Sequence, residues 1–223
     1  MAFDLKYLGH SGFEIKTGKQ SILIDPFLQN SNYDYRQEQI TDILLTHGHA
    51  DHVGSSLDIA KNKRATITAV FELAKYLSDR GAKVQDVNFG AWIEFDWGRA
   101  LFVHAVHSSS NLEGQYMGEP AGIIIEINGV TLYHAGDTAL FGDMKLIKKL
   151  YNPDVVMLPI GGKFTMDVEH AAIAARWLKG TITIPIHYNT FEDINADVHK
   201  FEILLQTKNL SCQIMKADEV LQF

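Results

Sequence analysis

The sequence has a single cysteine, Cys212, and this scarcity excludes several kinds of protein. No disulfide can form within the chain, and a metal site built from thiolates is not expected. Long hydrophobic runs are missing too, because no stretch reaches the roughly 18 apolar residues of a membrane helix. Residues 1–15 lack the basic and apolar regions of a signal peptide. We therefore expect a cytoplasmic protein with no membrane partner.

Positive charge is also in short supply, since the formal net charge is −7 at pH 7. Nucleic-acid-binding proteins usually carry a basic stripe, so no nucleic-acid partner is expected. A small anionic substrate stays compatible with this charge, because a bound metal can reverse the local potential. The 223 residues contain 46% hydrophobic residues and no Pro/Gly/Ser-rich linker. They predict a single domain over residues 1–223, built from two similar halves.

Apolar runs and turn residues predict alternating strands and helices in each half of the chain. The expected strands are 4–8, 13–17, 21–25, 42–46, 91–95, 100–106, 122–127, 130–135, 154–160 and 181–186. The expected helices are 71–80, 141–150, 167–180 and 192–207. Asn128-Gly129 predicts a tight hairpin, and Asp167 can cap the helix that follows it. Two sheets packed face to face with helices outside would satisfy this pattern.

Residues 46–52, THGHADH, place three histidines and an aspartate directly after an apolar strand candidate. His47 and His49 are two positions apart, so both side chains can converge on one cation from an extended or loop backbone. Asp51 and His52 can turn toward a second position nearby. A folding core gains nothing from such a cluster, because each buried imidazole needs a polar partner. Imidazole and carboxylate ligands without thiolate suit zinc, manganese or iron.

This stretch resembles the H-x-H-x-D-H signature of the metallo-β-lactamase superfamily. The segments YLGHSGFEI, ILIDPFL, HSSS, GDT and LPIGGKFTM are similar to small metal-dependent hydrolases that include the ascorbate-6-phosphate lactonase-like proteins. The resemblance extends from about residue 5 to residue 190. It implies an α/β (α+β) fold, a four-layered αββα sandwich of two mixed β-sheets flanked by helices. The metal site of that fold lies at one edge of the sheets.

The same resemblance implies three further metal ligands: His107 in AVHSSS, Asp137 in HAGDT and His187 in IPIHYNT. It assigns His47, His49, His107 and Asp137 to one divalent cation, and Asp51, His52, His187 and the shared Asp137 to another. Zinc is the first expectation for both cations, with manganese or iron as alternatives. A single cation with a catalytic water also stays open.

Two cations roughly 3.5–4 Å apart can share a hydroxide and polarise a substrate oxygen. Coordination lowers the pKa of the bound water towards about 7, which supplies a nucleophile at neutral pH. Asp51 has a second predicted role as a catalytic residue that orients this hydroxide. We therefore predict hydrolysis of a small-molecule lactone, carboxylic ester or phosphoester, in that order.

Other polar residues have two interpretations each. His10 is predicted near the mouth of the site, where it binds substrate or satisfies a backbone carbonyl. Lys163, after Gly161-Gly162, can bind a phosphate or carboxylate or simply close a tight turn. Asp25 is expected to orient a metal-binding histidine rather than to react. The remaining histidines, His104, His134, His170 and His199, are interpreted as structural or solvated.

Two alternative functions stay open beside the hydrolase. A di-iron redox protein of the same fold would use a similar ligand set, although the chain shows no flavin-binding extension. A non-catalytic module would keep the cations for stability or for contact with a partner. The intact set of seven ligands argues against such a module. A homo-oligomer is compatible with the sequence.

Overall fold

The computed structural model describes residues 2–223, which group into two compact units. Unit 1 contains the residues up to Ala91, together with Ser108–Pro120 and Lys216–Phe223. Unit 2 contains Trp92–His107 and Ala121–Met215. Each unit has its own β-sheet and its own helices. The expectation of one domain over residues 1–223 stays a prediction.

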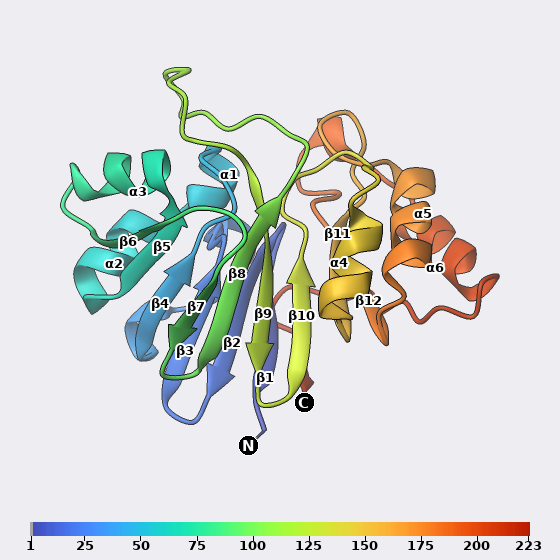
Figure 1. Cartoon of the computed structure of the whole chain (residues 1–223), viewed down its shortest axis with the longest axis horizontal. Helices are drawn as coiled ribbons and strands as arrows, with labels where there is room; N and C mark the ends of the chain where they lie inside the picture. Colours follow the sequence, from blue (N-terminus) through green and yellow to red (C-terminus); the bar gives the residue numbers. More distant parts are fainter. Residues whose placement is uncertain (1) are drawn as a thin grey trace. The chain divides into compact units, whose positions relative to one another are not determined.

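Unit 1 is built on a seven-stranded mixed sheet in the order β13-β1-β2-β3-β4-β5-β6. The strands are β1 (Asp4–Gly9), β2 (Gly12–Thr17), β3 (Gln20–Ile24), β4 (Ile40–Leu44), β5 (Thr66–Val70), β6 (Lys83–Val87) and β13 (Val220–Gln222). The helical segments are η1 (Leu28–Asn30), η2 (Tyr35–Gln37), α1 (Ala50–Val53), α2 (Ser56–Lys63) and α3 (Phe71–Ser78). β1 to β3 pair antiparallel, whereas β3 to β6 pair parallel. Parallel neighbours need crossover connections, and α2 lies in the connection from β4 to β5 and α3 in that from β5 to β6 (Figure 1), whereas η1 and η2 lie between β3 and β4.

The parallel part of this sheet has a buried apolar core. Ile43, Leu44 and Leu45 are fully buried, and Ile43 and Leu45 pack in one cluster with Ile67 from β5 and Leu73 from α3. Such strands appear in sequence as continuous apolar runs, because helices cover them. The chain leaves β4 at its carboxyl end, and the next residues carry the histidine-rich segment. The histidine-rich segment therefore begins directly at the end of a buried strand.

Unit 2 is built on a six-stranded mixed sheet in the order β12-β11-β10-β9-β8-β7. Its elements are β7 (Trp92–Phe95), β8 (Gly98–His104), β9 (Ala121–Ile127), β10 (Val130–His134), α4 (Met144–Tyr151), β11 (Val155–Pro159), α5 (Val168–Leu178), β12 (Ile182–Ile186), η3 (Glu192–Ile194) and α6 (Val198–Gln206). β7 to β10 pair antiparallel, and β10 to β12 pair parallel. Asn128 and Gly129 both have positive φ, 52° and 85°, as the predicted hairpin turn requires.

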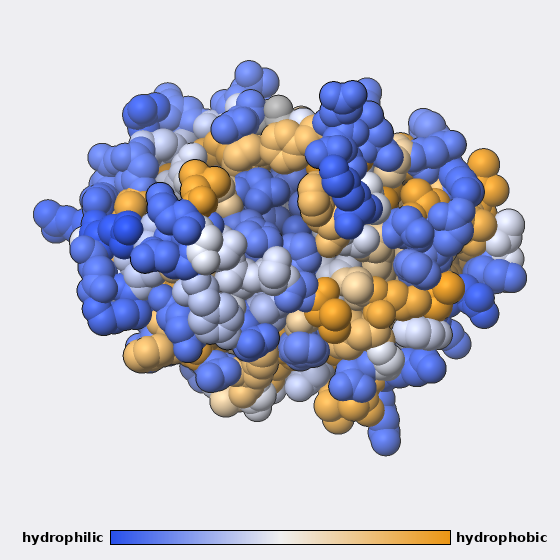
Figure 2. All heavy atoms as spheres, turned by 90° about the horizontal axis from the view of Figure 1, so that it is seen from above, coloured by the Kyte–Doolittle hydropathy of each residue, from blue (hydrophilic) through white to orange (hydrophobic). Residues whose placement is uncertain are grey.

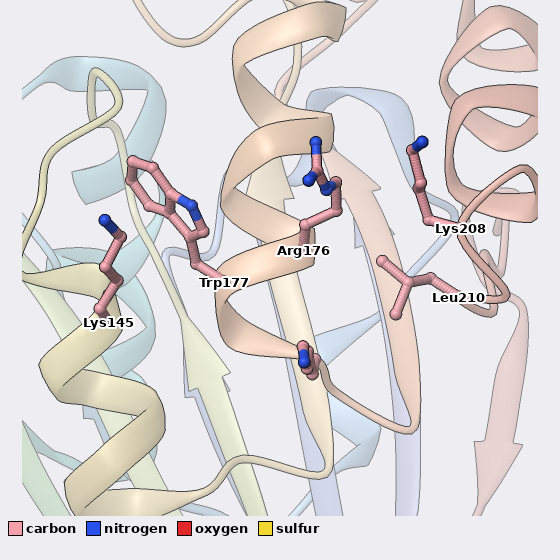
Figure 3. Close-up of a pocket in the computed structure, with 6 residues that line it drawn as sticks. Lys145, Arg176, Trp177, Lys208 and Leu210 are labelled. Carbon is pink, nitrogen blue, oxygen red and sulfur yellow. The ribbon is translucent and has the colours of Figure 1, made fainter.

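The helices of unit 2 present a basic hollow of about 510 Å³ to solvent. Figure 3 shows Lys145 and Trp177 on one side of α5, and Arg176 and Lys208 on the other. The ammonium of Lys145 lies 4.4 Å from the ring centroid of Trp177, a favourable cation–π distance. Arg176 belongs to the last turn of α5, and Lys208 follows the end of α6. Both cations thus lie where the helix dipole favours positive charge.

Most predicted elements are confirmed, but some boundaries are wrong. The helix predicted over 192–207 is a short η3 followed by α6, which begins only at Val198. Asp197 caps α6, because its side chain accepts a hydrogen bond from the backbone N–H of Lys200. The helix predicted from residue 141 begins at Met144. The elements β5, β6, α2 and β13 were not predicted, because short or charged stretches such as β6 carry little periodicity.

The surface carries hydrophobic side chains singly or in small groups. The face seen in Figure 2 is largely hydrophilic, with hydrophobic patches separated by polar residues. Leu112 is the most exposed large hydrophobic residue of the described chain, at 86%. None of the helices in residues 2–223 is long and apolar enough to cross a membrane.

Candidate metal centre

The histidine-rich segment leaves β4 through Leu45 and Thr46 and enters α1 at Ala50. His47 and His52 are fully buried, whereas His49 and Asp51 are partly exposed. The Nε2 atom of His47 lies 2.9 Å from Nδ1 of His49, so these two nitrogens point at a common position. His49 also precedes α1, and its backbone carbonyl accepts the N–H of Val53 at 2.9 Å. The turn into α1 thus holds the two nitrogens together.

A buried carboxylate holds this segment from the neighbouring strand. Asp25 follows β3 and is fully buried, with a left-handed φ of 43°. Its carboxylate accepts the backbone N–H of Thr46 at 2.9 Å and the Thr46 hydroxyl at 2.6 Å. The same carboxylate lies 2.7 Å from Nδ1 of His52. The expectation that Asp25 orients a histidine of the motif therefore agrees with its contacts.

These contacts determine which nitrogen of each buried histidine can bind a metal. A carboxylate only accepts hydrogen bonds, so Asp25 requires the proton of His52 to be on Nδ1. The Thr46 hydroxyl donates its one proton to Asp25 and must accept from Nδ1 of His47, 3.0 Å away. Both rings consequently carry the lone pair on Nε2. Such hydrogen bonds fix the tautomer and raise the basicity of metal-binding histidines.

A second group of donors in unit 1 forms around His10. His10 is fully buried, and its Nε2 lies 3.0 Å from a carboxylate oxygen of Asp51. Ligand atoms of His10, Asp51 and His52 all lie within 4.8 Å of one another. The backbone carbonyl of His10 accepts the hydroxyl of Tyr7 at 2.8 Å. His10 thus contacts the aspartate of the motif directly, and its left-handed φ of 56° turns it there from the end of β1.

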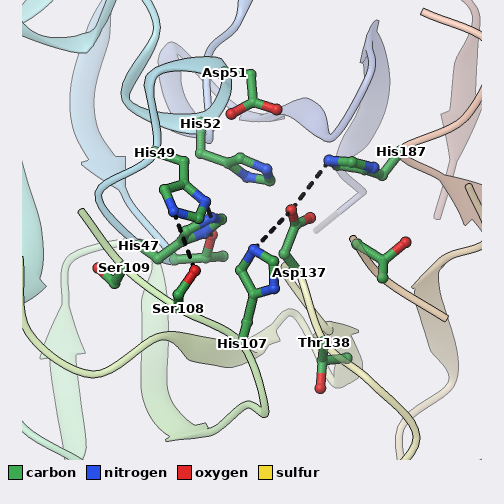
Figure 4. A network of polar contacts seen from close by, with 12 residues as sticks. His47, His49, Asp51, His52, His107, Ser108, Ser109, Asp137, Thr138 and His187 are labelled. Atoms are coloured by element: carbon green, nitrogen blue, oxygen red, sulfur yellow. Dashed lines mark hydrogen bonds and ion pairs between the residues drawn. The ribbon is translucent and has the colours of Figure 1, made fainter. Parts of the chain in front are cut away.

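Unit 2 gathers the other three predicted ligands around one carboxylate. Asp137 follows β10, and its Oδ2 lies 3.1 Å from Nε2 of His187 and 3.5 Å from Nε2 of His107. Figure 4 shows these two contacts as dashed lines that meet at Asp137. Asp137 and His187 are almost completely buried. The structure therefore brings His107, Asp137 and His187 together, although 80 residues separate the first from the last.

Backbone hydrogen bonds between two loops position this cluster. Thr138 is fully buried, and its hydroxyl accepts the N–H of Val106 at 3.0 Å. The N–H of Ala139 donates to the carbonyl of Val106 at 2.9 Å. Each loop is therefore held by a hydrogen bond one residue away from a predicted ligand, His107 on one side and Asp137 on the other. The sequence contains no separate signal for Thr138 beyond its place in GDT.

Lys163 and the glycines before it have a structural explanation. A Cβ atom at Gly161 would lie 2.3 Å from the carbonyl oxygen of His187, so only glycine fits beside this ligand. The ammonium of Lys163 lies 2.7 Å from a carboxylate oxygen of Asp193, and both side chains are about half exposed. Lys163 is thus held in an ion pair. Its predicted role in substrate binding stays a prediction.

The remaining histidines lie at structural or solvated positions. His134 is fully buried in β10, where its Nδ1 accepts the N–H of Gly136 at 3.1 Å. His170 and His199 are exposed at the surface of α5 and α6. β8 ends at His104, so the expected alternation of side chains along the strand does not extend to His107. These positions agree with the interpretation from the sequence.

The donor chemistry fits divalent cations of the zinc, manganese and iron type. All seven predicted ligands offer imidazole nitrogen or carboxylate oxygen, and both buried histidines of unit 1 present Nε2. The only thiol, Cys212, belongs to neither group of metal donors among the described residues, and burial raises its pKa to about 12. A nearby Glu202 raises this pKa further.

Comparison with known proteins supports the same conclusion. A model of the beta-lactamase superfamily domain matches residues 4–187. The chain belongs to the β-lactamase superfamily. This superfamily member is 47% identical to a UPF0173 metal-dependent hydrolase from Lysinibacillus sphaericus, with 97% of each chain covered. It is 45% identical to another from Bacillus thuringiensis, covering 96% of this chain and 97% of that protein.

Solved structures extend the likeness to the whole fold. Igni18, a metallo hydrolase from the hyperthermophilic archaeon Ignicoccus hospitalis, superposes with a TM-score of 0.92 at 32% identity. The match covers 100% of this chain and 99% of Igni18. The predicted metallo-β-lactamase fold and the predicted class, a metal-dependent hydrolase, are therefore confirmed. The closer resemblance to the ascorbate-6-phosphate lactonase-like group stays a prediction.

Proposed function

We propose that the protein is a binuclear hydrolase that cleaves a lactone, a carboxylic ester or a phosphoester of a small molecule. In this proposal His47, His49, His107 and Asp137 hold one divalent cation, and Asp51, His52, His187 and Asp137 hold the other. Zinc is the first candidate for both cations. Bound divalent cations supply Lewis acidity, which makes a water nucleophilic at neutral pH and polarises a substrate oxygen.

The observation that carries the proposal is the orientation of two buried imidazoles. Asp25 and Thr46 occupy Nδ1 of His52 and His47 and leave both lone pairs on Nε2. Two buried apolar residues would stabilise the fold at least as well as these two histidines, because a buried polar group costs free energy unless it is hydrogen-bonded. Metal-binding histidines commonly have such partners. The arrangement is therefore one that supports metal binding.

Two residues beside the ligands receive proposed roles. Asp51 is partly exposed, so its carboxylate is able to accept a proton from the attacking water and aim its lone pair. His10 is fully buried, with its Nε2 3.0 Å from a carboxylate oxygen of Asp51, and its predicted contact with substrate stays a prediction. We assign His10 to the positioning of Asp51. Lys163 would need to leave Asp193 before it could bind an anionic substrate group.

The test combines elemental analysis with a substrate panel. Protein purified without added metal is analysed for zinc, manganese and iron, then assayed on γ-lactones, p-nitrophenyl esters and phosphodiesters before and after chelation. Hydrolysis that chelation abolishes and metal restores is expected. His52→Ala should lower metal content and hydrolysis, whereas the matched change His199→Ala, at an exposed histidine, should alter neither.

Three other results would contradict the proposal. Full metal content without turnover of any substrate would favour a non-catalytic binding module. Iron together with consumption of dioxygen or nitric oxide would favour the redox alternative. Equal loss of metal in His199→Ala and His52→Ala would show that the measured metal is bound outside the proposed site.

A further inference from the structure

Residues 109–117 form a tight hairpin whose two ends are fixed to the turn that carries the metal ligands. At one end, the hydroxyl of Ser109 accepts the backbone N–H of Gly48 at 3.1 Å. At the other end, Met117 packs so closely on Gly48 that a Cβ there would lie 2.4 Å from the Met117 Cβ. Gly48 separates His47 from His49, so both contacts fall between two ligands. Ser109 and Met117 are themselves buried.

Several hydrogen bonds within the hairpin join its two strands and its tip. The backbone N–H of Met117 donates to the carbonyl of Ser109 at 3.1 Å. Near the tip, the side-chain oxygen of Asn111 accepts the N–H of Glu113 at 3.1 Å and of Gln115 at 2.9 Å. The N–H of Asn111 donates to the carbonyl of Gln115. These hydrogen bonds stabilise the turn that carries the tip residues.

The tip of hairpin 109–117 borders a hollow of about 180 Å³ beside the ligand segment. Leu112 and Glu113 line it from the hairpin, Val53 from α1 and Tyr76 from α3, together with Gly48, which stands between His47 and His49 in the chain. This volume is below the roughly 300–1,000 Å³ of pockets that hold whole drug-sized ligands. It is suited to one part of a substrate whose reactive bond lies at the neighbouring ligands.

The lining determines which chemical group fits. Leu112, Val53 and Tyr76 provide apolar surface, and no cationic side chain lines this hollow. The one charged residue is Glu113, whose carboxylate repels an anionic substituent. An exposed leucine at 86% is unremarkable alone. Leu112, however, lies at the rim of an apolar hollow, on a hairpin that contacts the turn at residues 47–49. It can therefore contact a substrate group that enters the hollow.

We propose that this hollow binds a short, uncharged hydrocarbon substituent of the substrate, and that Leu112 is a specificity-determining residue. The inference rests on the proposed hydrolase function and adds a substrate class to it: small esters or lactones that carry a hydrocarbon chain of a few carbons. Any anionic group of the substrate then lies away from this end.

The test measures kcat/KM of the metal-loaded full chain along two series. One series is p-nitrophenyl acetate, butyrate, hexanoate and octanoate; the other is γ-butyrolactones with γ-alkyl chains of increasing length. Each methylene that enters the hollow should raise kcat/KM by about threefold to fourfold, until the small volume is filled. Leu112→Asp should flatten the increase, so that kcat/KM rises by less than about twofold from the acetate to the hexanoate. Leu112→Met should retain the increase.

Leu150→Asp is the matched control, because Leu150 is an exposed leucine of α4 in unit 2. It should leave both series unchanged. Glu113→Gln should improve p-nitrophenyl hemisuccinate about fivefold, through loss of the repulsion between two carboxylates. Saturation-transfer NMR with hexanoate, the product acid, gives a readout independent of turnover. Its signal should weaken in Leu112→Asp and persist in Leu150→Asp.

Failure of this inference differs from failure of the proposed function. Hydrolysis with no dependence on chain length in either series would overturn the hydrocarbon pocket and leave the hydrolase intact. An equal loss of chain-length dependence in Leu150→Asp would also overturn the role of Leu112. Absence of hydrolysis for every substrate would overturn the function, and absence of hexanoate binding would then overturn the pocket as well.

Discussion

The two units position their proposed metal-binding residues by different means. In unit 1 four of them occupy positions 47–52 of one segment, directly after β4. In unit 2 His107, Asp137 and His187 follow three different strands, β8, β10 and β12. Unit 1 relies on a buried carboxylate from another strand, whereas unit 2 relies on backbone hydrogen bonds between loops.

The difference shows what each arrangement requires from the rest of the chain. A local cluster can form within one turn, but its rings still need an external partner to fix their tautomers. A dispersed cluster needs a sheet whose strand ends bring distant loops together. Both units contain fully or almost fully buried residues with left-handed backbone at these sites: His10 and Asp25 in unit 1, and His187 in unit 2. Such strained positions persist where the surrounding structure holds them.

Asp137→Ala should have the largest effect, because Asp137 is the common partner of both histidines in unit 2. If Asp137 holds both cations, metal content should fall well below two per chain and hydrolysis by about a thousandfold or more. Elemental analysis and kcat/KM measure the two effects. Asp86→Ala, at an exposed carboxylate of β6, is the matched control. Unchanged metal stoichiometry in Asp137→Ala would contradict the shared role.

Asp25→Asn tests whether unit 1 depends on its buried carboxylate. The change preserves side-chain volume but puts an N–H₂ group where one carboxylate oxygen accepts two contacts, from Thr46 and His52. Loss of such an outer partner typically weakens metal affinity by about 10- to 100-fold. Competition with a chromogenic chelator measures this change. An affinity equal to that of the unmodified protein would show that His52 is oriented without Asp25.

Thr138→Val is the corresponding change in unit 2 and should have a smaller effect on metal binding. It removes the hydroxyl that accepts the N–H of Val106 in a partly buried hydrogen bond, which should cost about 0.5–1.5 kcal/mol in the free energy of unfolding. Urea denaturation measures this cost. The control, Thr207→Val, alters an exposed hydroxyl at the end of α6 and should stay within about 0.5 kcal/mol. Equal destabilisation by both would rule out a special role for Thr138.

The smallest effect on metal content is expected for Cys212, the thiol of unit 2. Its alkylation shows whether the thiol is reactive in the folded protein. With a pKa of about 12, only about one thiol in ten thousand is ionised at pH 8, so iodoacetamide should react very slowly. Mass spectrometry of native and guanidinium-unfolded protein measures the rates. Metal content should be unchanged in Cys212→Ser. Rapid labelling of native protein would contradict the raised pKa of the thiol, and loss of metal in Cys212→Ser would show that the thiol takes part in metal binding.

Much of the site could be predicted from the sequence, for identifiable reasons. The segment 46–52 contains its donors at consecutive positions, and the buried strand before it appears as an apolar run. His107, Asp137 and His187 could be named only through the resemblance to a family, since nothing local distinguishes them from His104 or His134. Their roles as ligands stay predictions, while their proximity to one another within unit 2 is a structural fact.

Other features could not have been found from sequence patterns. The late start of α6 depends on Asp197 as a cap, which competes with the turn at η3. Ser109 and Met117 acquire their roles only by packing on Gly48, about 60 residues earlier in the chain. Burial of His10 against Asp51 was equally invisible, because a strand-end histidine has no periodic signature.

The amino-acid sequence by itself determined the kinds of donors, their crowding at positions 47–52 and the lack of any thiolate alternative. It also determined most strands, because local apolar patterns specify them. Tertiary structure alone decided which nitrogen each imidazole presents, since the partner Asp25 lies 27 residues from His52. It likewise decided that Asp137 lies between His107 and His187 in unit 2. Hydrogen bonds and close packing between distant residues depend on the folded backbone, and no local pattern encodes them.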